Sequence, residues 1–145
     1  MKAVIQRVQR GSVTVEGRRV AEIGHGLVIL LGVGPADSDE NARALARKIA
    51  LLRIFEDDQG KMNRSVLDVG GAAVVVSQFT LFADTRKGNR PAFTDAALPA
   101  HAKPLWERFC QLLAEQGVPT QAGEFGAHMV VEIINDGPVT IVMEL

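Results

Sequence analysis

Hydroxyl and amide side chains lie where a β-branched run of the sequence ends. The run 73–76 is typical of a buried strand, and Ser77, Gln78 and Thr80 follow it at what should be a sheet edge. A serine or threonine hydroxyl can attack an ester carbonyl when a base lies beside it. Because neither Ser77 nor Thr80 has such a partner nearby in the sequence, hydrogen bonding at a strand end is the simpler interpretation.

The segment 135–138, Asn-Asp-Gly-Pro, is the second feature with unusual chemistry. It lies between two apolar stretches, where a hairpin turn normally contains Asn-Gly or Asp-Gly and leaves the next residue free to pair. Pro138 lacks that donor and restricts its neighbour Gly137, which hints at a cis peptide bond. Since X-Pro bonds in folded proteins are mostly trans, the pattern alone leaves trans as the default.

Residues 83–97 are predicted to form a loop that contains the one concentrated basic stretch of the chain. Arg86, Lys87 and Arg90 place three cations within five residues, a modest cluster. An ordinary solvated loop and a phosphate-binding loop therefore both remain open. The formal net charge is −1, so any contact with nucleic acid must rest on a local patch of this kind.

Several classes of site are not expected. His25, His101 and His128 lie far apart and lack the short ligand spacing of zinc sites, so we expect no metal. Walker and G-x-G-x-x-G loops are absent from the sequence, which argues against a nucleotide cofactor. Cys110 follows Phe109 on a predicted helix and is interpreted as packing material.

Length and composition favour a single domain spanning residues 1–145. The chain is 47% hydrophobic, enough for a sizeable core. Its one cysteine cannot form an internal disulfide, and Met1-Lys2 leads directly into a strand pattern, so we expect a cytoplasmic location. No apolar run approaches the roughly 18 residues of a membrane span, and no membrane partner is expected.

Hydrophobic periodicity predicts the elements that must position these residues. Strands are expected at residues 4–8, 13–16, 19–23, 27–31, 54–56, 73–79, 129–134 and 139–143, the last two joined by a turn at 135–138. A first helix should begin at a capping box formed by Asp37 and Glu40. A second should cover 99–116, with its true first turn at Pro104. The pattern favours an α+β fold: a curved, largely antiparallel, barrel-like sheet with two α-helices.

Four motifs, taken together and in this order, resemble the signatures of the D-aminoacyl-tRNA deacylase family. The opening Gln6-Arg7-Val8 matches as well, and the resemblance covers essentially the whole chain. Two departures, Gly11 and Trp106 where alanine and tyrosine are expected, lie outside the motifs. The motifs are 77–82 (SQFTLF), 87–91 (KGNRP), 125–127 (FGA) with Met129, and 135–140 (NDGPVT).

The resemblance implies a hydrolase that cleaves the ester between a D-amino acid, or mischarged glycine, and the 3′ end of tRNA. It further implies a homodimer with active sites at the subunit interface. Gly137 and Pro138, joined by a cis bond, would reach into the partner's pocket and reject L-amino acids sterically. Arg7 would brace this dipeptide, and aminoacylated tRNA would be the other partner.

The resemblance also assigns roles within the pocket. Residues Ser77 to Thr80 would line it, with main-chain donors around Phe79 and Thr80 stabilising the oxyanion. Gln78 would help to seat the terminal adenosine. Since no base is evident, the 2′-hydroxyl of the terminal ribose would assist. The remaining expected site residues are Phe125 and Met129 as the pocket wall, which are equally interpretable as core residues, and Arg86, Lys87 and Arg90 as tRNA contacts.

Two alternatives remain at this point. Thr80 could act as a covalent nucleophile in an esterase. The chain could instead be a dimeric module that binds the RNA acceptor end without catalysis. A mere binder, however, has no need to insert the dipeptide of Gly137 and Pro138 into a pocket.

Overall fold

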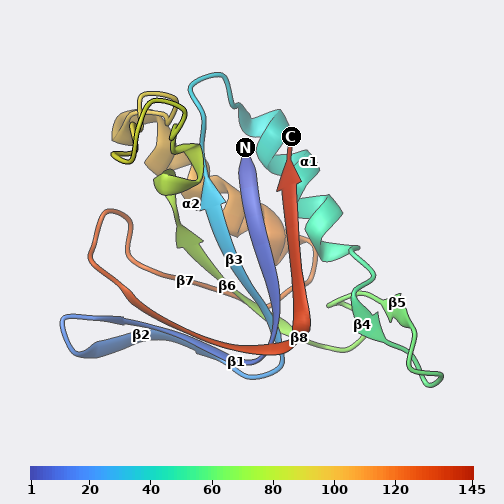
Figure 1. The fold of residues 1–145 in the computed structure, drawn as a ribbon. Coiled ribbons are helices and arrows are strands. Elements are labelled where there is room, and N and C mark those ends of the chain that lie inside the picture. The colour runs from blue at the N-terminus through green and yellow to red at the C-terminus, as the bar shows by residue number, and fades with distance from the viewer.

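The computed structural model describes residues 1–145, and six of its strands form one sheet. The strand order is β2-β1-β3-β6-β7, and β8 also pairs with β1 (Figure 1). A small hairpin of β4 and β5 stands apart from this sheet. The elements are β1 (Lys2–Val15), β2 (Arg18–Ile23), β3 (Gly26–Gly32), α1 (Asp39–Ala50), β4 (Phe55–Glu56), β5 (Met62–Arg64), β6 (Ala72–Ser77), the 3-10 turn η1 (Phe79–Phe82), α2 (Pro99–Glu115), β7 (Thr120–Ala122) and β8 (Val130–Glu144).

β1 and β8 are long strands that bend together and give the sheet its curved, barrel-like form (Figure 1). The first part of β1 pairs with β3 and the last part with β2, while β8 follows β1 along both parts. This confirms the expected α+β class, with its curved sheet and two helices. Sequence periodicity predicts two shorter strands in place of each, because the pairing shifts where the strands bend.

The segment 135–138 is not a hairpin turn, and the prediction that it joins two strands is wrong. Gln6 of β1 faces Thr140 of β8, and Val8 faces Asn135. Four residues of β8 therefore stand opposite the single residue Arg7, and the chain continues along the same partner after this bulge. The Asn135 side-chain amide closes the base of the bulge by donating to the carbonyls of Arg7 and Val139, at 2.9 and 3.1 Å.

The pairing directions divide the sheet into two parts. β1 runs antiparallel to β2, β3 and β8, as expected, whereas β6 runs parallel to both β3 and β7. Parallel neighbours need a long crossover between them, and α1 and α2 lie within these two connections. The sheet is thus mixed, and its parallel part brings the ends of β3 and β6 to one edge.

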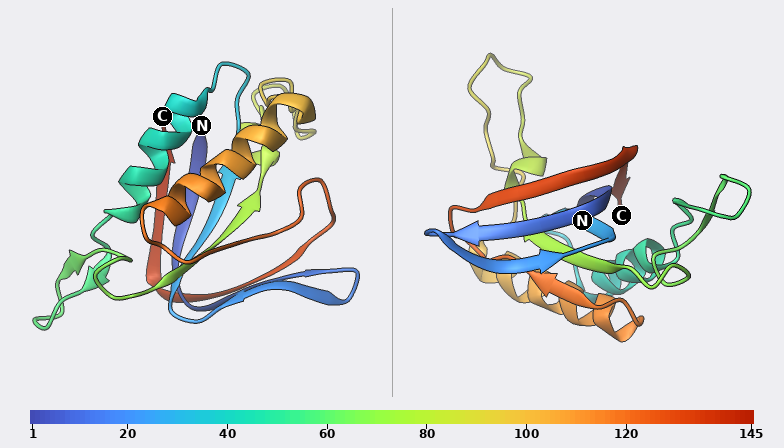
Figure 2. Two further views of the ribbon diagram at one scale, coloured as in Figure 1. Left: turned by 180° about the vertical axis from the view of Figure 1, so that it is seen from behind. Right: turned by 90° about the horizontal axis from the view of Figure 1, so that it is seen from below.

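Both helices cover the same face of the sheet (Figure 2). They enclose the larger core, a cluster of 24 buried residues that includes Ile29, Leu45 and Phe109. A second cluster of eight residues fills the inside of the bend between β1, β2 and β6. Neither helix is long and apolar enough to cross a lipid bilayer.

The second helix begins earlier than the sequence suggests. α2 starts at Pro99, where a proline loses no helical hydrogen bond, and Pro104 lies inside the helix rather than in its first turn. The main-chain N–H groups of His101 and Ala102 both donate to the carbonyl of Leu98, which fixes the earlier start. The missing N–H of Pro104 is tolerated because the helix is held by its buried apolar face.

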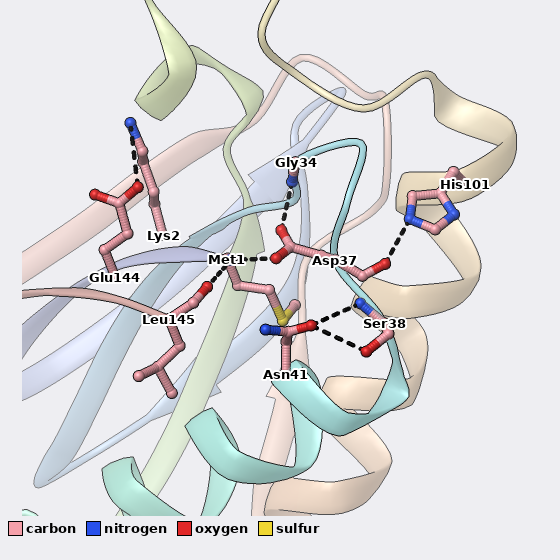
Figure 3. Close-up of polar contacts among 9 residues, drawn as sticks. All are labelled: Met1, Lys2, Gly34, Asp37, Ser38, Asn41, His101, Glu144 and Leu145. Atoms are coloured by element: carbon pink, nitrogen blue, oxygen red, sulfur yellow. Dashed lines mark hydrogen bonds and ion pairs between the residues drawn. The ribbon is translucent and has the colours of Figure 1, made fainter.

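The cap of α1 is also shifted, by one residue, because Asp37 has another role (Figure 3). The N-cap is Ser38, whose N–H donates to Asn41 Oδ1 at 3.0 Å. Asp37 instead accepts hydrogen bonds from the α-ammonium group of Met1 and from the N–H of Gly34, each at 2.6 Å. Its main-chain oxygen lies 2.8 Å from His101 Nε2. Asp37 thus joins the residue before β1, the loop after β3 and α2.

Gly26 is required by the close approach of β3 to β6. A Cβ atom at this position would lie 1.8 Å from the carbonyl oxygen of Ala72. We expect Gly26→Ala to lower the free energy of unfolding by about 2 kcal/mol or more, because strand backbone must move to accept the methyl group. Urea denaturation followed by circular dichroism measures this loss. Gly24→Ala is the matched control, since a Cβ there has no atom within 4 Å; equal stability of the two variants would contradict the packing argument.

Candidate active site

A cavity of about 390 Å³ opens at the edge where β3 and β6 end. Its lining residues come mainly from the start of η1, the first half of α2 and the loop that leads into β8. Twelve of its sixteen lining residues are hydrophobic, so the cavity can exclude water from a ligand. The lining residues are Leu31, Val33, Ser77, Gln78, Phe79, Phe93, Ala96, Ala97, Leu98, Pro99, Ala102, Trp106, Phe125, Gly126, Ala127 and Met129.

The end of β6 holds the polar residues of this cavity in place. Ser77 is paired with Leu31 of β3, and the Gln78 N–H donates to the Leu31 carbonyl at 2.8 Å. The chain then turns into η1, where the Phe79 ring packs edge to face on Phe93, with centroids 5.1 Å apart. Five residues expected at the site from sequence meet here: Ser77, Gln78, Phe79, Phe125 and Met129.

Thr80 lies beside the cavity rather than in its lining. Its side chain is exposed, and its hydroxyl oxygen accepts a hydrogen bond from the Gln78 side-chain amide. Phe79 and Thr80 are the first two residues of η1, so their main-chain N–H groups have no partner within that turn, and none of the backbone hydrogen bonds formed outside helices and strands uses them. Two free donors therefore adjoin the polar end of the cavity.

No titratable side chain lines the cavity. The chain holds no cluster of three or more His, Cys, Asp or Glu residues arranged for a metal ion. Burial raises the pKa of Cys110 to about 12, so its thiol stays protonated at neutral pH and is no nucleophile. The chemistry available at the cavity is that of hydroxyl, amide and main-chain groups.

Sequence reasoning missed the wall that α2 contributes. Pro99, Ala102 and Trp106 line the cavity, and the Trp106 ring lies 5.8 Å from that of Phe125. Their spacing of three and four residues marks a second apolar stripe on the helix, beside the one that faces the core. That stripe is the feature of the sequence from which the α2 wall of the cavity could have been predicted.

Three other residues expected at the site lie away from the cavity: Arg7, Gly137 and Pro138. The 137–138 peptide bond is cis, and both residues are exposed on the β8 bulge. Arg7 is buried beneath them: its Nε donates to the Asp136 carbonyl at 2.8 Å and its Nη1 to the Ile54 carbonyl at 2.7 Å. Its Nε also lies 3.3 Å from Asp136 Oδ2. The guanidinium thus holds the bulge from below.

Within one chain the bulge and the cavity are separated. Arg7 faces Leu27 of β3, whereas Ser77 faces Leu31, four residues further along the same strand. At about 3.3 Å per residue this is roughly 13 Å, and neither residue of the Gly-Pro dipeptide lines the cavity. Figure 1 shows the bend of β8 and the turn η1 at opposite ends of the sheet.

The basic loop carries fewer free cations than its sequence suggests. Arg86 pairs with Asp84 at 2.7 Å, and its hydrogen bond to that carboxylate lowers the pKa of Asp84. The loop is closed at its base by the bridge between Asp84 and Ala92. Lys87 and Arg90 make no ion pair and are exposed. They leave two unpaired positive charges near the cavity.

Comparison with solved structures identifies the same fold in known proteins. A structure described as the c-Myc DNA unwinding element binding protein is 42% identical, with a TM-score of 0.93 over 100% of this chain and 99% of that one. A probable eukaryotic D-amino acid tRNA deacylase aligns with a TM-score of 0.85 over 99% and 98% of the two chains. At 17% identity this second match supports the fold alone.

Sequence comparison places bacterial relatives along the full chain. Proteins named D-aminoacyl-tRNA deacylase from Heliobacterium modesticaldum and Roseiflexus castenholzii are 60% and 58% identical over 99% of this chain, and over 96% and 92% of their own. The protein of that name from Deinococcus radiodurans is 54% identical over the whole of both chains. The family model described as D-Tyr-tRNA(Tyr) deacylase matches residues 4–144. The chain therefore belongs to the D-Tyr-tRNA(Tyr) deacylase family.

Proposed function

We propose that the protein hydrolyses the ester that joins a D-amino acid to the 3′ end of tRNA. The observation that carries this proposal is the apolar cavity whose polar end offers Ser77, Gln78 and two free main-chain N–H groups but no acid or base. The names of the relatives supply the class of substrate. An aminoacyl ester is already activated, so a site that positions it and stabilises negative charge suffices.

The free N–H groups of Phe79 and Thr80 are assigned to the oxyanion of the tetrahedral intermediate. They need no reorganisation, because η1 and the end of β6 hold the main chain around them. Single donors of this kind are worth roughly 2.7–4 kcal/mol in other hydrolases. Ser77 and Gln78 then hydrogen bond the terminal ribose or adenine.

The role of general base in the hydrolysis is assigned to the tRNA substrate. Since no titratable side chain lines the cavity, the 2′-hydroxyl of the terminal ribose orients the attacking water, accepts its proton and passes its own proton to the departing 3′ oxygen. The alternative, a covalent ester on Thr80, is disfavoured because that hydroxyl is exposed and has only the Gln78 amide beside it. An amide cannot accept the proton that such a nucleophile must lose.

Chiral selection is assigned to a second copy of the chain. Gly137 and Pro138 project from the exposed bulge and do not reach the cavity of their own chain. In a homodimer the dipeptide of one protomer enters the cavity of the other and meets the side chain of an L-amino acid. A D-side chain points away from it, and glycine has none, so both are accepted. The tRNA phosphates are contacted at the rim of the cavity by Lys87, Arg90 and Arg86, the last of which is also paired with Asp84.

The first prediction concerns the chirality of the amino acid that the protein releases from tRNA. The purified protein should release D-tyrosine from D-tyrosyl-tRNA far faster than L-tyrosine from the matched L-tyrosyl-tRNA, because only the L-side chain meets the dipeptide. Release of the labelled amino acid at equal tRNA concentration measures both rates. Equal rates on the two substrates would refute the proposed function.

The second prediction concerns the base. A D-aminoacyl-tRNA ending in 2′-deoxyadenosine should be hydrolysed roughly 10²- to 10⁴-fold more slowly than the ribose form, the usual contribution of a positioned base. Thr80→Ala keeps its main-chain N–H, so its turnover should stay within about tenfold of wild type. Unchanged hydrolysis of the deoxy substrate, or complete loss in Thr80→Ala with adenosine binding intact, would favour the covalent route.

The third prediction concerns the support of the bulge. Arg7→Lys keeps the charge but cannot donate in two fixed directions, so the dipeptide should lose part of its anchor. We expect the ratio of D- to L-tyrosyl-tRNA hydrolysis to fall about tenfold, equivalent to about 1.4 kcal/mol. The ratio is the right measurement because it does not depend on the folded fraction.

Arg10→Lys is the control for this variant, since Arg10 is exposed and pairs only with Glu132. Its ratio should match wild type. A ratio that falls equally in both variants would show that the anchor of Arg7 is irrelevant to selection. A monomer in sedimentation under assay conditions would contradict the two-copy site.

A further inference from the structure

An open groove lies where α1 ends. Figure 1 shows this end of α1 on the opposite side of the sheet from η1. We name this groove the α1 groove. Its lining includes Leu51, an apolar residue that is 52% exposed. Its lining residues are Ala44, Arg47, Lys48, Leu51, Leu52 and Arg53.

The α1 groove carries positive charge that the chain does not neutralise. Arg47 and Lys48 are exposed and form no ion pair, unlike Arg43, which pairs with Asp39 at 3.0 Å. Arg53 donates to the carbonyl and the side-chain oxygen of Asn63, both uncharged acceptors. Three cations therefore remain available in one concave surface.

The acidic residues of the adjoining β4–β5 hairpin do not reduce this charge by pairing with it. Asp57 accepts the main-chain N–H groups of Gln59 and Lys61, and the bond from Lys61 is the largest cause of its lowered pKa. Asp58 pairs with Arg64 at 3.0 Å. Asp68, whose pKa is lowered mainly by the Ser65 N–H that it accepts at 2.8 Å and also by the charge of Arg53, forms no ion pair.

The α1 groove and the Gly137 bulge share one anchor. The Arg7 guanidinium donates to the carbonyl of Ile54, the residue after Arg53, and to that of Asp136, the residue before Gly137. Both carbonyls lie within 2.8 Å of the same side chain. The cationic groove therefore flanks the dipeptide that we assign to the partner's cavity.

We propose that the α1 groove binds backbone phosphates of the tRNA whose 3′ end occupies the partner's cavity. This inference rests on the proposed function and adds a second, trans-acting tRNA surface to Lys87 and Arg90. If the bulge enters the partner's cavity, the α1 groove beside it lies near the mouth of that cavity, where a polyanion would meet Arg47, Lys48 and Arg53. The contact is to phosphate, so it adds affinity without sequence preference.

The experiment compares full-length D-tyrosyl-tRNA with a short substrate, D-tyrosyl-adenosine, which has no acceptor-stem phosphates. Lys48→Glu should lower the ratio of kcat/KM on the full-length substrate to that on the short one by about tenfold at low salt. The dependence of log Kd for tRNA on log salt concentration should become shallower by about one unit for each lost phosphate contact. Arg47→Glu should behave in the same way.

Arg18→Glu is the matched control, because Arg18 is exposed on β2, makes no ion pair and changes the net charge equally. Its ratio and salt slope should match wild type. An equal fall in Arg18→Glu, or an unchanged ratio and slope in Lys48→Glu, would overturn the inference while the wild-type protein still hydrolyses its substrate. Failure of wild type on D-tyrosyl-tRNA would instead remove the proposed function itself.

Discussion

The guanidinium of Arg7 is the interaction on which the arrangement of the molecule depends. It is almost fully buried, and its planar donors reach the carbonyls of Ile54 and Asp136 in two fixed directions. One side chain from β1 thereby joins the segment after α1 to the bulge of β8. This link holds the Gly-Pro dipeptide beside the segment that follows α1, and hence close to the α1 groove. An aliphatic side chain here would leave the buried carbonyl of Ile54 and the partly buried carbonyl of Asp136 without this donor.

Much of the fold could be predicted from periodicity, but not the pairing. Alternating residues correctly located β2, which buries one face, whereas continuous apolar runs located β3 and β6, which are buried on both faces. Periodicity does not report direction, so the parallel pairs of β6 went unseen. It also breaks at a bulge, which made β8 look like two strands and a turn. The capping residue of α1 was misplaced because Asp37 is bound by Met1, a partner 36 positions away in the sequence.

The residues of the candidate site could be predicted from sequence motifs, but their positions in the fold could not. Ser77, Phe125 and Met129 were expected to lie together, and one cavity contains them. That Gly137 lies at the other end of β3 depends on strand register, which no single motif carries. The pairing of Arg86 with Asp84 could have been suspected, because the two residues are only two positions apart. The wall from α2 was overlooked, since its apolar stripe adjoins one that faces the core.

The position of Trp106 in the cavity wall has a practical consequence. It is the only tryptophan of the chain, and the chain has no tyrosine, so its indole provides essentially all of the intrinsic ultraviolet emission. The ring is mostly buried beside Phe125 at the cavity, where any ligand that enters changes its surroundings. Emission from this one ring therefore reports occupancy of the cavity directly, without a label and with no second fluorophore to subtract.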